Sequence, residues 1–153
     1  MRKFAVDCMM GKLARWLRIL GYDTFFDCSI DDNQLLMIAT AEMRILLTKD
    51  RELAAKGGYL VLAKSWRDEL KEVVRAFHLE KDIKPFTRCP VCNGELKEIE
   101  REDAEKLVPP IAFKNATKFS ICKKCGRVYW DGSHMVRMKK IVEKIIKEAK
   151  DEG

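Results

Sequence analysis

The chain has 153 residues, of which 47% are hydrophobic and 35% are charged, and its formal net charge is +6. This length suits one domain, or one core domain with a small module, and the apolar share is large enough for a core. No apolar run reaches the roughly 18 residues of a membrane-spanning helix. Asp7 and Gly11 interrupt the N-terminal stretch where a signal peptide would be apolar. We therefore expect a cytoplasmic protein with no membrane partner.

The positive charge is concentrated in one part of the sequence. Residues 1–85 carry nearly balanced charges, whereas residues 114–140 contain eight Lys or Arg and a single acidic residue, Asp131. A basic segment of this kind is typical of proteins that bind a polyanion such as RNA. The solvated surface of a protein rich in Lys and Glu would have a similar composition. Charge alone therefore leaves both interpretations open.

Strand and helix patterns alternate four times in the first 80 residues. Four short apolar runs are typical of strands that are covered on both faces: residues 2–6, 23–26, 44–48 and 59–63. A helical period follows each run, and it is clearest where Leu13, Trp16, Leu17 and Leu20 recur at i, i+3, i+4 and i+7. The alternation predicts an α/β fold, with a parallel sheet between two layers of helices.

The first predicted helix also has a polar face and a clear end. Lys12, Arg15 and Arg18 lie away from the apolar stripe, so we expect all three to be exposed. Gly21 follows the last apolar position, where a glycine commonly ends a helix.

The pattern stops at His78, where a polar connector begins, and we expect three units. Residues 1–84 form the α/β domain and residues 85–134 form a smaller module. Residues 135–153 form a final helix, whose apolar stripe would dock on one of the other two units.

The smaller module contains two pairs of cysteines with CxxC spacing: Cys89, Cys92, Cys122 and Cys125. Two residues between cysteines let both thiolates reach one ion, and two such knuckles make a closed tetrahedral site. Soft thiolates favour zinc over hard cations. Because four cysteines leave no open position for a substrate, we predict a structural zinc ion. Cys8 and Cys28 stand apart from these pairs.

Several carboxylates follow the predicted strands. Asp7 comes directly after residues 2–6, and Asp50 comes one residue after residues 44–48. Asp31 and Asp32 precede the helix that begins at the same edge of the sheet. In open α/β sheets, ligands bind beyond the carboxyl ends of the strands. Clustered carboxylates repel one another unless a cation lies between them, and hard oxygen ligands suit Mg²⁺ or Mn²⁺.

Helix capping is the alternative role for these residues. Asp is a common N-cap, and Asp31, Asp32 and Asp50 each lie near a predicted helix start. Asp68 fits a capping box with Ser65, and it could otherwise be a fourth acidic residue of the site.

The basic segment also contains aromatic residues and a histidine. Tyr129 or Trp130 could stack on a base, and His134 could contact a base or a phosphate. The alternatives are that the aromatic rings form the core of the zinc module and that His134 caps the last helix. No Gly-rich phosphate loop precedes a helix, so we expect no nucleotide cofactor.

Four segments together resemble the Mut-seven C-terminal RNase domain family: VDCMMGKLARWLRILGYDT, ILLTKDREL, CPxCN and CxxCGRVYWxGSH. The resemblance implies a PIN-like three-layer α/β/α fold with a zinc ribbon, and metal-dependent cleavage of RNA. It assigns the acidic positions to Asp7, Asp32 and Asp50, and the hydroxyl position to Thr48. One position departs from the family pattern, because Gln34 stands where an acidic residue is common before Leu-Leu. Asp31 or Asp32 would then supply the second ligand.

We therefore expect a ribonuclease that uses Mg²⁺ or Mn²⁺ and acts on single-stranded RNA. Lys12, Arg15 and Lys49 would hold the RNA backbone near the cut. Further contacts would come from the zinc module: Lys123, Lys124, Arg127, Tyr129 and His134. The alternative is a non-catalytic RNA- or ribosome-binding adaptor that uses the zinc ribbon and the basic segment.

Overall fold

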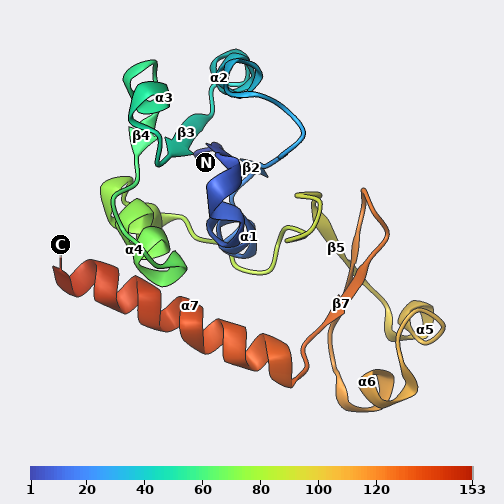
Figure 1. Ribbon diagram of the computed structural model, residues 1–153. Helices are drawn as coiled ribbons and strands as arrows, with labels where there is room; N and C mark the ends of the chain where they lie inside the picture. The colour runs from blue at the N-terminus through green and yellow to red at the C-terminus, as the bar shows by residue number, and fades with distance from the viewer. Residues whose placement is uncertain (153) are drawn as a thin grey trace.

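The computed structural model describes residues 1–152, and its N-terminal part is built on a four-stranded parallel sheet (Figure 1). The strands are β1 (Phe4–Val6), β2 (Thr24–Phe25), β3 (Ile45–Thr48) and β4 (Tyr59–Leu60), in the order β2-β1-β3-β4. All three pairings are parallel, as the sequence predicted. The second and fourth strands are shorter than their apolar runs, with two residues each.

Helices cover both faces of this sheet. On one face lie α1 (Gly11–Ile19) and α4 (Trp66–Ala76), and on the other lie α2 (Asp32–Ala41) and α3 (Arg51–Ala55). Strand β1 serves both layers, because Phe4 and Val6 belong to the first core cluster and Ala5 belongs to the second. This alternation is the two-residue period of a strand. The three-layer α/β/α prediction is confirmed.

The C-terminal module has an antiparallel sheet with the order β5-β6-β7. Its strands are β5 (Leu96–Ile99), β6 (Phe119–Cys122) and β7 (Val128–Trp130), and two short helices lie between β5 and β6, α5 (Arg101–Ala104) and α6 (Pro110–Asn115). A separate small core of Ala104, Val108, Ala116 and Phe119 supports this module.

Helix α7 (Ser133–Glu152) returns from the C-terminal module to the first domain. Figure 1 shows it running from the three-stranded sheet back along α4. Its buried residues Val142, Ile145 and Ala149 join the cluster formed by α1, α4 and the sheet, so the predicted stripe docks on the first domain. Gly153, the last residue of the predicted helical segment, lies outside the described residues. Within residues 1–152, no helix has the length and apolarity needed to cross a membrane.

The first cysteine knuckle is seated on the last turn of α1 by Arg18. This side chain is only 7% exposed, so the expected exposure of Arg18 is wrong. Its Nε donates to the Thr24 carbonyl at 3.0 Å, and its Nη1 donates to the carbonyls of Pro90 and Val91 at 3.2 and 3.1 Å. The guanidinium thereby satisfies backbone acceptors of both modules at once.

Asn93 makes the second contact between the modules. Its backbone is left-handed, with φ 72°, and its Oδ1 accepts from the Thr24 N–H at 2.9 Å while its Nδ2 donates to Asp23 Oδ1 at 2.7 Å. Arg44 donates to the same carboxylate at 2.8 Å. Burial alone would raise the pKa of Asp23, but the hydrogen bonds from Arg44 and Asn93 bring it below its usual value. Asp23 therefore joins the knuckle to the sheet as an ionised group.

Gly21 allows the connector between the modules to approach α1. Its φ is +101°, and a Cβ at this position would lie 2.3 Å from the Lys84 carbonyl oxygen. The close approach lets the N–H groups of Lys84 and Phe86 donate to the carbonyls of Leu20 and Ile19 at 3.0 and 2.9 Å. The glycine thus ends the helix, as predicted, and also makes room for the connector.

Replacing Arg18 with Ala should destabilise the protein strongly. The change removes charge-assisted hydrogen bonds and leaves buried carbonyls unpaired, so we expect the free energy of unfolding to fall by about 3 kcal/mol. Arg15→Ala, on the exposed side of the same helix, is the matched control and should change it by less than about 0.5 kcal/mol. Urea unfolding of both variants measures the difference, and equal values would contradict the anchoring role of Arg18.

Candidate functional site

The connections of the four-stranded sheet reverse direction between β1 and β3. The chain leaves β1 toward β2 through α1, and it leaves β3 toward β4 through α3 on the opposite face. In open α/β sheets ligands bind beyond the carboxyl ends of the strands at such a reversal, and we call this part of the sheet edge the crevice. Val6 pairs with Leu47, so the residues that follow these strands enter this crevice: Asp7, Lys49 and Asp50.

Asp7 is held at the crevice by neighbours on β3. Its side chain is largely buried, with 8% of the residue exposed, and its N–H donates to the Leu47 carbonyl at 3.0 Å. The fully buried Thr48 hydroxyl donates to Asp7 Oδ2 at 2.8 Å and accepts from the Asp50 N–H at 3.0 Å. One hydroxyl group therefore links the two acidic positions. Within the described residues, the second oxygen of Asp7 has no hydrogen-bond partner.

Asp50 also caps a helix. Its Oδ1 accepts from the N–H groups of Glu52 and Leu53, at 2.8 and 3.4 Å, at the start of α3. Capping occupies one oxygen, and the other has no hydrogen-bond partner among residues 1–152. Both roles considered for Asp50 are therefore geometrically compatible.

Asp31 and Asp32 have different surroundings. Asp31 is the N-cap of α2: its Oδ1 accepts from the Gln34 N–H at 2.8 Å, and Gln34 Oε1 accepts from the Asp31 N–H at 2.9 Å. This capping box gives Gln34 a structural role at the position where the resemblance implied an acidic residue. Asp32 is the exposed first residue of α2, and its side chain has no hydrogen bond or ion pair with the rest of residues 1–152.

The acidic candidates do not converge as closely as the cysteines do. Across residues 1–152, only the four-cysteine group brings three or more candidate ligand residues within 4.8 Å of one another. The carboxylates of Asp7, Asp32 and Asp50 are more widely spread than that. The hydrogen-bonded unit at the crevice consists of Asp7, Thr48 and Asp50.

A buried glutamate lies beside this unit, and the sequence analysis missed it. Glu69 of α4 is 6% exposed, and its Oε2 lies 2.6 Å from Lys49 Nζ. The signal was its position four residues before the buried Val73, on the apolar face of α4. Asp68, the residue proposed instead, is exposed and bonds to the Ser65 hydroxyl in the predicted cap.

A disulfide ties the crevice to the loop that leads to Asp32. Cys8 directly follows Asp7 and is bonded to Cys28, with a sequence separation of 20. The sequence analysis set these cysteines apart from the metal pairs and assigned them no role, because two cysteines so far apart in sequence have no local signature of a disulfide. The disulfide closes a loop that contains all of α1 and β2.

The four remaining cysteines form a compact group. The sulfurs of Cys89 and Cys125 are 3.8 Å apart, those of Cys92 and Cys122 are 3.3 Å apart, and all four lie within 4.8 Å of one another. A tetrahedral zinc ion about 2.3 Å from each sulfur would separate the sulfurs by about 3.8 Å. The cluster could therefore bind a metal such as zinc.

Two local features support this fit. The backbone N–H and the side chain of Arg127 lower the pKa of the Cys125 thiol to about 6, which favours the thiolate that a metal binds. Gly94 lies so close that a Cβ there would be 2.7 Å from Cys122 Sγ. The knuckle therefore requires a residue without a side chain at this position.

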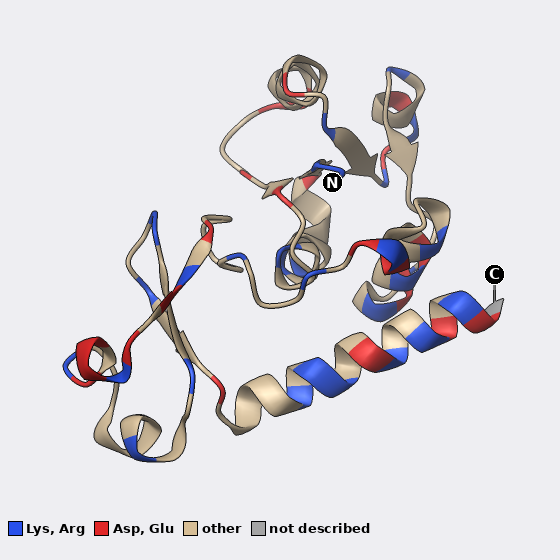
Figure 2. Cartoon of the chain, turned by 180° about the vertical axis from the view of Figure 1, so that it is seen from behind, with Lys and Arg blue, Asp and Glu red and all other residues tan. Residues whose placement is uncertain are grey.

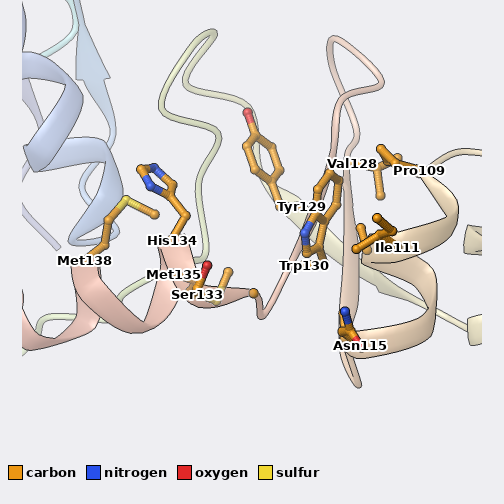
Figure 3. A pocket seen from close by; sticks show the side chains of 13 residues that line it. Pro109, Ile111, Asn115, Val128, Tyr129, Trp130, Ser133, His134, Met135 and Met138 are labelled. Atoms are coloured by element: carbon orange, nitrogen blue, oxygen red, sulfur yellow. The ribbon is translucent and has the colours of Figure 1, made fainter.

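The remaining RNA-contact candidates lie around this cluster. Lys123, Lys124 and Arg127 are exposed. The Tyr129 hydroxyl lies 2.9 Å from Cys89 Sγ, so part of this ring belongs to the metal module, as the alternative interpretation held. His134 is exposed in the first turn of α7 and faces a cavity of about 580 Å³ between α6, β7 and α7 (Figure 3).

Comparison with protein families gives one match. The model described as the Mut7-C RNAse domain matches residues 2–142, nearly the whole chain. Comparisons with curated proteins and with solved structures found no match.

Removing the disulfide should weaken the fold. Cross-linking residues 20 apart restricts the unfolded chain, and the loop length corresponds to about 3 kcal/mol. We expect Cys8→Ser combined with Cys28→Ser to lower the free energy of unfolding by that amount, measured by urea unfolding without reductant. A phosphine reductant should reproduce the loss in the wild type and leave the double variant unchanged. Equal stability of the oxidised and reduced wild type would contradict this prediction.

Proposed function

Since the chain belongs to the Mut7-C RNAse domain family, we propose that it is a metal-dependent ribonuclease that hydrolyses phosphodiester bonds of single-stranded RNA. The observation that carries the proposal is the hydrogen-bonded unit at the crevice, in which Thr48 bridges Asp7 and Asp50. We propose the cytoplasm as its location. Because disulfides are rare in a reducing cytoplasm outside hyperthermophiles, the Cys8–Cys28 bond would then suit a thermophilic cell.

The donor set at the crevice suits a hard cation. Asp7 and Asp50 each keep one oxygen that no neighbour in residues 1–152 occupies. Mg²⁺ commonly uses only one or two carboxylates, together with waters and substrate phosphates. A bound Mg²⁺ or Mn²⁺ would supply an activated nucleophile and stabilise the charge that develops on the phosphate. We assign Asp32 as a third acidic residue that acts through water, with Asp31 kept to its capping role.

The positive side chains near the crevice would hold the RNA backbone. Lys12 and Arg15 are exposed on α1, and Lys49 lies between Thr48 and Asp50, where Glu69 fixes its ammonium group. Figure 2 shows further Lys and Arg residues on the C-terminal module and along α7. The cations of the ribbon, Lys123, Lys124 and Arg127, with Tyr129 and His134, would add affinity with little sequence preference.

We propose zinc as the ion of the four-cysteine cluster, and we assign it a structural role. Four thiolates leave no position for a substrate. We also propose the division into residues 1–84, 85–134 and 135–153. A zinc ion would stabilise the middle unit, whose own core is small.

A non-catalytic RNA- or ribosome-binding adaptor is the second candidate. One observation favours it: Asp7, Asp32 and Asp50 do not gather as tightly as the four cysteines do. An adaptor would bind RNA with strong salt dependence and would show no turnover that EDTA abolishes.

Replacing Asp7 with Asn should abolish cleavage and preserve binding. We expect Mn²⁺-dependent cleavage of a labelled single-stranded RNA to fall roughly 100-fold or more, because a ligand charge is lost while the acceptor for Thr48 remains. Asp50→Asn should act similarly, since Asn still caps a helix.

Asp103→Asn, an exposed carboxylate of α5, is the control and should cut at the wild-type rate. RNA binding in EDTA should be unchanged in all three variants. Wild-type cleavage by Asp7→Asn would refute the carboxylate mechanism, and wild-type protein without EDTA-sensitive cleavage would favour the adaptor.

Metal analysis should find one zinc ion per chain in protein purified without chelators. Cys122→Ser with Cys125→Ser should lose it and make the C-terminal module sensitive to protease, because a site of this type contributes on the order of 10 kcal/mol. The Cys8→Ser and Cys28→Ser double variant is the matched control and should keep its zinc. Zinc that remains after loss of Cys122 and Cys125 would exclude this cluster as the site.

A further inference from the structure

Trp66 belongs to the helix that carries Glu69, the ion-pair partner of Lys49. It is the first residue of α4, directly after the connection from β4, and its side chain is half-buried. Its ring stacks on the buried ring of Trp16 from α1, with centroids 5.0 Å apart and an interplanar angle of 13°. The underlying ring holds Trp66 in one orientation while part of it faces solvent.

Two cations lie against the same ring. Lys12 Nζ is 5.9 Å and Arg67 Cζ is 5.3 Å from the Trp66 centroid, and both side chains are exposed. Proteins that bind single-stranded nucleic acid combine an aromatic ring, on which a base stacks, with cations that contact the backbone. An Arg guanidinium can also stack on a base. Trp66, Lys12 and Arg67 supply all of these groups in one place.

The neighbours of this ring belong to, or contact, the chain segments that carry the carboxylates. Lys12 lies five residues after Asp7, separated from it by the 3₁₀ turn Cys8–Met10. Glu69, one turn after Trp66 in α4, forms its ion pair with Lys49, between Thr48 and Asp50. Lys12 therefore lies on the segment that follows Asp7, and the helix of Trp66 contacts the segment that carries Asp50.

Core packing explains only part of this arrangement. Trp66 packs at the edge of the main core cluster, but burial of a ring does not require two exposed cations beside it. Two cavities beside Trp130 are also lined by aromatic rings: the one in Figure 3 has no Lys or Arg in its lining, whereas the other includes Lys118 and Lys139. Trp66 differs from both because it lies in the domain that carries Asp7 and Asp50.

We propose that Trp66, with Lys12 and Arg67, binds one unpaired nucleotide of single-stranded RNA next to Asp7 and Asp50. The base stacks on the face of the indole that Trp16 leaves open and displaces the two cations from the ring, and the cations then contact the flanking phosphates. The site rests on the proposed function for the identity of its ligand, and it explains how a strand would be aligned for cleavage without readout of its sequence.

Binding can be measured apart from cleavage. In an Asp7→Asn background with EDTA, the anisotropy of a labelled single-stranded oligoribonucleotide reports the Kd. Trp66→Ala should weaken binding about 10-fold, the size of one lost base stack, whereas Trp66→Phe should stay within about 3-fold. Arg67→Ala should weaken binding about 3-fold and reduce its salt dependence. Lys106→Ala, which removes an exposed charge from the C-terminal module, should bind like the parent.

An oligonucleotide of the same length with abasic residues separates stacking from charge, and it also serves if Trp66→Ala does not fold. The Asp7→Asn parent should bind it about 10-fold more weakly than the RNA, and Trp66→Ala should show no further loss. Equal binding of both strands by the parent, or equal Kd values for the parent and a folded Trp66→Ala, would overturn the proposal. Loss of binding in Trp66→Ala, together with wild-type protein that does not cleave, would support the nucleotide site and refute only the ribonuclease.

Discussion

The buried hydroxyl of Thr48 joins the sheet to the candidate site. Asp7 is almost entirely removed from water, and a carboxylate in that position needs hydrogen bonds to remain. Thr48 provides one from the neighbouring strand, and the same hydroxyl accepts the N–H of Asp50, whose side chain begins α3. One oxygen atom therefore bonds both the side chain of Asp7, directly after β1, and the backbone of Asp50, the residue that caps α3. A shift of register between β1 and β3 would break the first of these bonds.

The segment from Arg18 to Thr24 connects this site with the C-terminal module. In the family motif it continues directly from the residues around Asp7, and its own side chains contact the first knuckle instead of the crevice. Arg18 and Asp23 form hydrogen bonds with residues of both modules, and Asn93 of the knuckle accepts a hydrogen bond from Thr24. The motif therefore contains first an acidic residue at the crevice and then the side chains that bind the first knuckle of the C-terminal module.

The parts predicted from sequence were those with a local signature. Apolar periods fix the parallel sheet and the helices of the first domain, and CxxC spacing identifies the four-cysteine cluster. Arg18 was misjudged because its acceptors lie 72 and 73 residues away, so that no helical period reveals its burial. The same applies to the partner of Cys8 and to the ion pair of Glu69, since each depends on where distant segments pack. Tertiary packing, which local pattern does not contain, decides these three.

The disulfide also constrains Asp32, the acidic candidate whose surroundings differ most from those of Asp7 and Asp50. Cys8 follows Asp7 directly, and its Cα lies 5.1 Å from that of Cys28. Asp32 comes four residues after Cys28, and four Cα–Cα steps of extended chain span at most about 14 Å. The bond therefore limits how far Asp32 can lie from Asp7, whatever the conformation of the intervening loop. This limit is loose, about 23 Å between the two Cα atoms, so the packing of Leu35 and Ala39 of α2 against the sheet is what holds Asp32 in its place.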